Sequence, residues 1–232
     1  MDAGVIFVFH EEAGSARLQV SGELFRYLIK VRRHSQGDTI AMRNNATPTM
    51  LYRYTIEHIE NRAAVLSLLQ SAEVVVSAVR RLHIIWCVID TKSIEKVLPT
   101  LTELGVAKIS FVACARSQRN FKLDFQRFQR MVSAAMQQCG RSEFMEFEQL
   151  AGLEEALQRY EKLVYLDFCD TLFKASHAID TVLVGCEGGF SDDERKLLAS
   201  QQGFCLNTPM VLRSESAVCA VASQILLRPF KS

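Results

Sequence analysis

The fold of this chain is decided by the stretch Val182-Leu-Val-Gly-Cys-Glu-Gly-Gly-Phe190. The apolar residues 181–184 predict a buried strand, and the three glycines after them predict a loop whose backbone can turn sharply and approach a ligand closely. A helix should follow, because Ser191 and Glu194 have the spacing of a capping box. The stretch is therefore typical of a strand-loop-helix unit in an α/β protein.

A second unit of the same kind follows in the sequence. Residues Phe204 to Leu206 predict its strand, and Met210-Val-Leu-Arg-Ser-Glu-Ser-Ala217 leads into an apolar closing helix predicted over Ser216 to Leu227. The carboxyl ends of parallel strands meet at one edge of a sheet, so the two loops should lie side by side. In open α/β sheets that edge is where ligands bind.

The two loops together resemble the signature of a known family. Gly185-Cys-Glu-Gly-Gly-Phe-Ser191, followed by Val211-Leu-Arg-Ser-Glu-Ser-Ala217, is similar to the signature of the ribosomal RNA small subunit methyltransferase E family. That family belongs to the SPOUT superfamily of RNA methyltransferases. In the same order along the chain, similarity extends to Leu101-Thr-Glu-Leu-Gly-Val106, Arg116-Ser117, Gln137-Gln-Cys-Gly-Arg141 and, weakly, Lys30-Val-Arg-Arg33.

The resemblance implies an α/β fold with two domains. Residues 1–72, where short apolar runs alternate with Gly, Asn and Pro, would form a small PUA-like β-barrel that binds RNA. Residues 73–232, where β-α-β alternation predicts a parallel sheet, would form a SPOUT methyltransferase domain with a trefoil knot. The knot comes from the resemblance alone.

The implied reaction is transfer of a methyl group from S-adenosyl-L-methionine to N3 of a uridine in small-subunit (16S) rRNA, on an assembled 30S subunit. Arg213 and Glu215 would be catalytic, with the guanidinium stabilising charge on the uracil oxygens; a purely structural ion pair between the two is the alternative. The predicted cofactor-binding residues are Leu166, Phe168, Gly185, Glu187, Gly188, Gly189, Leu206, Val211, Leu212, Ser214 and Ser216. Asp167 could accept a hydrogen bond from a ribose hydroxyl or cap a turn.

Basic residues on a predicted helix, Gly22 to Arg33, point to RNA. Its buried face should be Leu24, Leu28 and Val31, while Arg26, Lys30 and Arg33 form a basic row on another face. Such a row is as often a solvated surface as a phosphate-binding one. The resemblance favours RNA binding for this row and for two further residues, Arg116 and Arg141. Arg141 also suits the C-terminus of a helix, where a positive charge is favourable.

The chain departs from the family pattern at several positions: Thr100, Gln137, Cys186, Thr208 and Met210. A non-catalytic RNA-binding or ribosome-assembly factor that retains the fold is therefore the alternative function. Methylation of tRNA is a weaker third possibility, because the N-terminal domain and the residue order match it less well.

Composition excludes several other classes. The net charge of +1 argues against non-specific coating of nucleic acid. The longest apolar run, Ile84 to Ile89, is too short to span a bilayer, and the start of the chain lacks the pattern of a signal peptide. Seven scattered cysteines and five scattered histidines indicate neither a disulfide framework nor a metal site. We therefore expect a cytoplasmic, metal-free protein, and the resemblance implies a homodimer.

Overall fold

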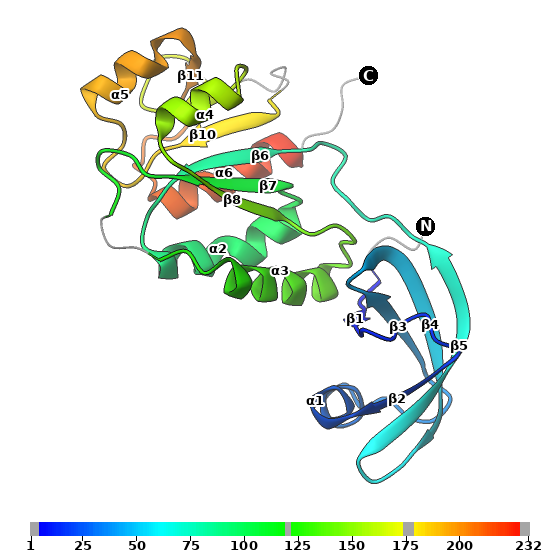
Figure 1. Ribbon diagram of the computed structural model, residues 1–232. Helices are drawn as coiled ribbons and strands as arrows, with labels where there is room; N and C mark the ends of the chain where they lie inside the picture. Colours follow the sequence, from blue (N-terminus) through cyan, green and yellow to red (C-terminus); the bar gives the residue numbers. More distant parts are fainter. Residues whose placement is uncertain (1–4, 119–121, 174–178, 228–232) are drawn as a thin grey trace. The chain divides into compact units, whose positions relative to one another are not determined.

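The computed structural model describes residues 5–118, 122–173 and 179–227 (Figure 1). The chain divides into two compact units, Met1–Ser77 with Met136–Glu143, and Ala78–Ala135 with Phe144–Ser232. Residues 136–143, which the sequence analysis groups with residues 73–232, thus cluster with the first unit. Within the described residues, no helix has both the length and the apolar content needed to cross a lipid bilayer.

The first unit contains a five-stranded sheet in the order β1-β3-β4-β5-β2. Its strands are β1 (Val8–Phe9), β2 (Arg17–Ser21), β3 (Thr39–Asn44), β4 (Thr47–Ile59) and β5 (Ala63–Glu73). All pairs are antiparallel except β1 with β3. Register shifts interrupt the pairing of β4 at both of its partners, and Figure 1 shows the long β4 and β5 bending along their length. The sheet is therefore curled.

The helical segment of this unit differs from the predicted helix. It begins as α1 (Gly22–Phe25) and continues as the π-helix η1 (Arg26–Val31), in which Arg32 N–H donates to Tyr27 O five residues earlier. The wider turn changes the phase of the side chains, so Val31 is 65% exposed, and Phe25 is buried with Leu28 instead. The prediction of Val31 as a core residue was wrong for this reason.

The second unit contains a six-stranded sheet, and all of its strands are parallel, as predicted. The order is β11-β9-β10-β6-β7-β8. The strands are β6 (His83–Cys87), β7 (Lys108–Val112), β8 (Glu146–Leu150), β9 (Val164–Leu166), β10 (Thr181–Val184) and β11 (Gln202–Phe204). Central β6 is buried along its whole length, because helices cover both faces of a parallel sheet.

Six α-helices are described in the whole chain, and five of them belong wholly or mainly to this second unit. These are α2 (Thr91–Leu104), α3 (Phe125–Cys139), α4 (Leu153–Arg159), α5 (Asp192–Leu197), which continues as the 3-10 helix η2 (Leu198–Ser200), and α6 (Ser214–Leu226). Figure 1 shows α2 and α3 on one face of the sheet and α4 on the other. Gly105 ends α2 with φ 95°. The predicted capping box of Ser191 and Glu194 is confirmed at the start of α5.

A polar network inside this unit joins three neighbouring strands. His83 Nε2 lies 2.6 Å from Ser110 Oγ, and Ser110 Oγ donates to Glu148, which also accepts from Lys108 Nζ at 2.8 Å. Burial lowers the pKa of His83 to about 4, and the positive charge of Lys108 adds to the effect. Burial alone would raise the pKa of Glu148, but hydrogen bonds from Lys108, Ser110 and Tyr160 outweigh it and lower that pKa to about 2.

We expect this network to make the protein sensitive to mild acid. In the unfolded chain His83 takes up a proton near the ordinary histidine pKa of 6.5, whereas the folded protein resists protonation of His83 down to about 4. Stability is therefore present above pH 6.5 and falls as the pH is lowered through this window. Between pH 7 and pH 5 the loss in the free energy of unfolding should be about 2 kcal/mol. Urea denaturation at both pH values measures it.

The matched variants are His83→Gln and His58→Gln, the second on an exposed histidine. His83→Gln should lose most of the pH dependence, and His58→Gln should keep it. Equal pH dependence in wild type and His83→Gln would contradict the assignment.

Candidate functional site

A pocket of about 260 Å³ lies at the carboxyl ends of β9, β10 and β11. The loop after β10 forms one wall, the residues after β9 and β11 form others, and the segment before α6 with the first turn of that helix completes it. The predicted juxtaposition of the two signature loops is therefore confirmed as a feature of the fold. It places ligand-binding space where open α/β sheets have it.

Nine of the eleven predicted cofactor-binding residues line this pocket: Leu166, Phe168, Gly185, Glu187, Gly189, Leu206, Val211, Leu212 and Ser214. Gly188 and Ser216, the other two, are exposed and are not part of its lining. The lining is mainly apolar side chains and loop backbone, which is typical of a small-molecule site. That these residues bind a cofactor stays a prediction.

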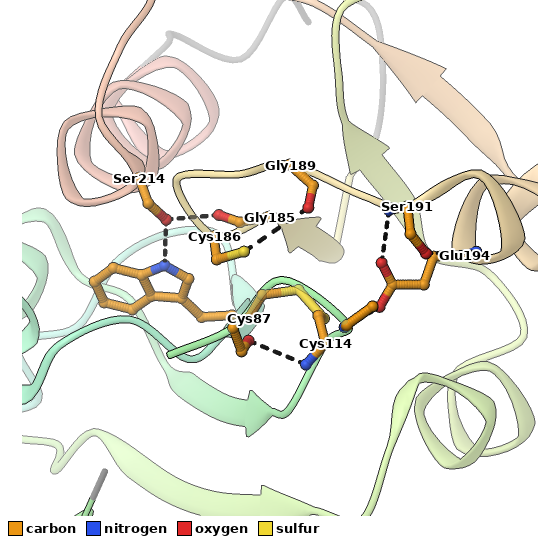
Figure 2. Close-up of a disulfide and its surroundings, with 11 residues drawn as sticks. Cys87, Cys114, Gly185, Cys186, Gly189, Ser191, Glu194 and Ser214 are labelled. Carbon is orange, nitrogen blue, oxygen red and sulfur yellow. Dashed lines mark hydrogen bonds between the residues drawn. A yellow bond between two sulfur atoms is a disulfide. The ribbon is translucent and has the colours of Figure 1, made fainter. Parts of the chain in front are cut away.

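The loop after β10 is a compact turn. Gly189 N–H donates to Cys186 O at 2.9 Å, and Gly189 has φ 63°, a left-handed conformation that side chains with a Cβ rarely adopt. The thiol of Cys186 points back to Gly189 O at 3.7 Å (Figure 2), and burial raises the pKa of this thiol. The loop is thus closed although Cys186 departs from the family pattern.

Ser214, the first residue of α6, links three segments. Its hydroxyl donates to Gly185 O at 2.6 Å and accepts from Trp86 Nε1 at 2.8 Å, and all three groups lie together in Figure 2. Trp86 belongs to β6 and is fully buried. The hydroxyl therefore holds the start of α6 and the start of the glycine loop against the core of the sheet.

Glu194 fixes the same loop from the other side. Its carboxylate is almost buried and accepts from Ser191 N–H at 2.8 Å (Figure 2). It also accepts from Ala115 N–H at 2.7 Å. The next residue, Arg116, donates from Nη1 to Gly188 O at 2.7 Å, and its side chain lies so close to Gly188 that a Cβ there would be 3.0 Å from Arg116 Cβ. The loop after β7 is thereby fastened to the glycine loop.

The cysteines correct one expectation from the sequence. Cys87, the last residue of β6, and Cys114, two residues beyond β7, form a disulfide with their Cα atoms 5.8 Å apart (Figure 2). Neighbouring parallel strands bring their carboxyl ends together, which a spacing of 27 residues does not reveal. Cys169, Cys186 and Cys205 are free thiols that line the pocket.

The polar residues beside the pocket have distinct roles. Asp167 is held by Arg195 through contacts of 2.9 and 3.3 Å, and it also accepts from Phe168 N–H. Its carboxylate is thus already paired. Arg213 is exposed and Glu215 is buried. Among the described residues, no ion pair joins Arg213 to Glu215.

The predicted RNA-binding residues are divided between the two units. In the first unit, Arg26, Lys30 and Arg33 are exposed, but Arg26 is paired with Glu23 at 2.8 Å, an acid that the sequence analysis overlooked. Arg141 belongs to the same unit and is 6% exposed, so its side chain presents little charge to solvent. Arg116 belongs to the second unit and contacts the glycine loop. Phe121, an aromatic residue five positions after Arg116 on which a base could stack, lies outside the described residues.

Several structurally important residues escaped the sequence analysis. Phe190, Cys169, Cys205 and Ala217 line the pocket without having been predicted. Their positions just after strands, or one turn into a helix, were the available signal. The hydrogen bond between Trp86 and Ser214 joins residues 128 positions apart, and no local pattern in the sequence predicts it.

Comparisons with known proteins can now be set beside this geometry. The family model described as an RNA methyltransferase domain matches residues 77–226. Ribosomal RNA small subunit methyltransferase E of Helicobacter pylori (strain ATCC 700392 / 26695) is 38% identical over 221 residues, covering 94% of this chain and 97% of that protein. The protein of the same name from Aquifex aeolicus is 30% identical over 151 residues, covering 60% and 64%.

Two solved structures share the fold. A putative methyltransferase of Legionella pneumophila, in complex with the cofactor S-adenosylmethionine, has a TM-score of 0.73 at 22% identity and covers 96% of this chain and 98% of its own. Ribosomal RNA small subunit methyltransferase E of Neisseria gonorrhoeae, bound to S-adenosyl methionine, has a TM-score of 0.72 at 20% identity, with 93% and 94% covered. With the identity to the Helicobacter protein over nearly the full length, these findings place the chain in the ribosomal RNA small subunit methyltransferase E family.

Proposed function

We propose that this protein transfers a methyl group from S-adenosyl-L-methionine to N3 of a uridine in small-subunit rRNA, within an assembled 30S subunit. The observation that carries the proposal is the pocket built from the two signature loops, in a chain that belongs to this family. The PUA-like character of the curled first unit, the knot in the second, and a cytoplasmic location are parts of the same proposal.

The pocket fits S-adenosyl-L-methionine in its chemistry. Leu166, Leu206 and Leu212 offer apolar surface for a flat adenine, and the backbone of residues 185–189 offers donors and acceptors for polar edges. The cofactor supplies, when bound, a methyl group activated by a sulfonium. The protein's own tasks are to hold it, exclude water and stabilise the uracil that must lose its N3 proton.

The exposed residues at the mouth of the pocket support the homodimer. Phe168, Met210 and Val211 line the pocket and are 77%, 64% and 78% exposed. Large apolar groups gathered at one rim are typical of surfaces that a partner covers. Helix α6 is also apolar, but it buries Val218, Val221 and Ile225 within its own unit. We therefore assign the dimer contact to the rim.

Methyl incorporation tests the function directly. Purified protein is incubated with labelled S-adenosyl-L-methionine and small ribosomal subunits that lack the modification, with naked rRNA and tRNA in parallel, followed by nucleoside mass spectrometry. We expect N3-methyluridine in the subunit sample. If folded protein incorporates no label into any substrate, the non-catalytic assembly factor becomes the better account; label in tRNA alone would favour a tRNA enzyme.

Changing Glu194 to Gln should weaken cofactor binding. A glutamine side chain has one acceptor oxygen, so either Ala115 N–H or Ser191 N–H loses its partner in a nearly buried position, at a cost of about 1–3 kcal/mol. The glycine loop is then less firmly held, and we expect Kd for S-adenosyl-L-methionine to rise about 10-fold, as 1.4 kcal/mol would give. Isothermal titration calorimetry measures the Kd.

Asp193→Asn is the matched control, because it removes an exposed carboxylate from the same helical turn, and among the described residues that carboxylate pairs with Lys196 alone. It should bind the cofactor like wild type. An unchanged Kd in Glu194→Gln would show that the bridge to Ala115 has no part in shaping the pocket.

A further inference from the structure

A second hollow, of about 280 Å³, lies within the first unit and shares no residue with the pocket described above. It is enclosed by the residues around β1, by η1 and the turn after it, and by the start of β3. We call it the Tyr27 hollow, and the lining residues used below are Ile6, Tyr27, Arg32 and His34. Nothing in the proposed methyl transfer requires it.

A tyrosine ring and a guanidinium in contact with it form one side of the Tyr27 hollow. Arg32 Nε donates to Tyr27 OH at 2.9 Å, and the guanidinium carbon lies 5.5 Å from the centre of the ring. Tyr27 is 37% exposed, and nearby Ile6 is 49% exposed. An aromatic ring and a guanidinium are the two side-chain surfaces on which nucleobases stack.

The backbone that creates this arrangement is unusual. After the π-helix, Arg33 has φ 61°, and it is the one non-glycine residue with a positive φ among those described. His34 N–H then donates to Leu28 O at 3.1 Å, which closes the turn and keeps His34 at the hollow. A left-handed residue costs of order 1 kcal/mol, and both this strain and π-turns gather at functional sites.

Charged side chains of both signs lie near the Tyr27 hollow. Lys30, Arg32 and Arg33 are exposed cations on the side of η1. Asp38 lies 3.4 Å from His34 Nδ1, and the hydrogen bond from Ser35 N–H lowers the pKa of Asp38, so it stays ionised at neutral pH. A phosphate is favoured beside η1 and disfavoured beside Asp38, whereas an uncharged base is accepted at both.

We propose that the Tyr27 hollow takes one unpaired nucleobase of the rRNA, stacked on the Tyr27 and Arg32 pair, with the adjoining phosphates on Lys30 and Arg33. This inference rests on the proposed function, which makes rRNA the partner, and it specifies the partner further: the first unit reads a single-stranded nucleotide rather than only the charge of a duplex. A flat base with apolar faces and polar edges matches the ring, the guanidinium and the imidazole that line the space.

The test is fluorescence anisotropy of the full-length protein with a labelled, short single-stranded RNA and with the same sequence as a duplex. Tyr27→Ala should weaken single-strand binding about 10-fold, within the 1–3 kcal/mol that one stacked base contributes, and leave the salt dependence unchanged. Lys30→Ala should instead make the fall of log K for RNA binding with log salt concentration less steep by about one, the contribution of one phosphate contact. Tyr27→Phe keeps the ring but removes the acceptor of Arg32 Nε, so it should lose clearly less affinity than Tyr27→Ala. Val31→Ala, at an exposed apolar residue of η1 outside the lining, should bind like wild type.

Crosslinking of the wild-type protein to RNA containing 4-thiouridine gives a second readout that does not depend on a variant folding. We expect adducts on residues of the Tyr27 hollow, found by peptide mass spectrometry. Three results would overturn the inference: unchanged RNA affinity in folded Tyr27→Ala, equal losses in Tyr27→Ala and Tyr27→Phe, or adducts only outside the Tyr27 hollow. Unchanged affinity would make a protein the better candidate to occupy the hollow.

Methyl incorporation into small subunits separates this inference from the proposed function. If wild type produces N3-methyluridine and Tyr27→Ala does so with the same KM, the base-binding hollow fails and the methyltransferase stands. If wild type produces none, the proposed function fails first.

Discussion

Replacing Arg213 with alanine should lower kcat for methyl transfer by about 100- to 1,000-fold, the loss typical of removing a group that stabilises developing charge. Arg213 is exposed at the start of α6, between Leu212 and Ser214, which both line the pocket. Its backbone carbonyl accepts from Ala217 N–H at 2.8 Å, but its guanidinium forms no ion pair or hydrogen bond with the described residues. The side chain is thus held at its base and available at its tip.

The proposed methylation of uridine N3 gives the reason for expecting a guanidinium to contribute there. N3 of uracil carries a proton and attacks a methyl group only once that proton leaves, when the charge spreads over O2 and O4. A positioned cation lowers the energy of that charge most effectively in a site with little water, and the apolar rim at Phe168 and Val211 would exclude water when covered. We expect KM for the cofactor to change little.

The measurement is single-turnover methyl transfer with small subunits, together with thermal unfolding. Arg213→Ala should keep a Tm within a few degrees of wild type, because an exposed side chain with no partner contributes little to stability. Lys196→Ala, on an exposed cation of α5, is the matched control and should be fully active. Arg213→Ala with more than half of the wild-type rate would remove Arg213 from the catalytic residues; a collapse of Tm would instead support a structural role.

Local signals in the sequence located the centre of the site. The apolar run at β10 and the capping box of α5 depend on a few adjacent residues, and both were placed correctly. At the second loop the strand was predicted at Phe204 to Leu206, but it is Gln202–Phe204. An isolated β-bridge between Leu172 and Cys205 lies just beyond the end of β11, so strand-like pairing continues there in an irregular form. Short strands shift easily because few residues define them.

Other features depended on long-range contacts and could not be read from the sequence. Arg141 matched a family motif, yet the fold buries it. The pairing of Cys87 with Cys114 required knowing which strands are neighbours. In each case a tertiary contact overrode a local pattern.

Changing Gly189 to Val should abolish detectable binding of S-adenosyl-L-methionine, which corresponds to a loss of at least about 100-fold, or 2.7 kcal/mol. Gly189 has φ 63°, and a β-branched residue is a severe outlier there. The backbone would have to move, and with it the turn from Cys186 O to Gly189 N–H that forms one wall of the pocket. Calorimetric titration with the cofactor measures the loss, and thermal unfolding reports the strain.

Gly22→Val provides the matched control for that strain. Gly22 has φ 61°, a Cβ there meets nothing within 4 Å, and the residue lies in the first unit, outside both pockets. The two variants should lose similar stability, since each forces a side chain into the left-handed region. Only Gly189→Val should lose the cofactor, because only there does the strained backbone also shape the pocket. If both variants bind the cofactor equally well, the glycine loop does not hold it, and the assignment of the cofactor to this pocket is wrong.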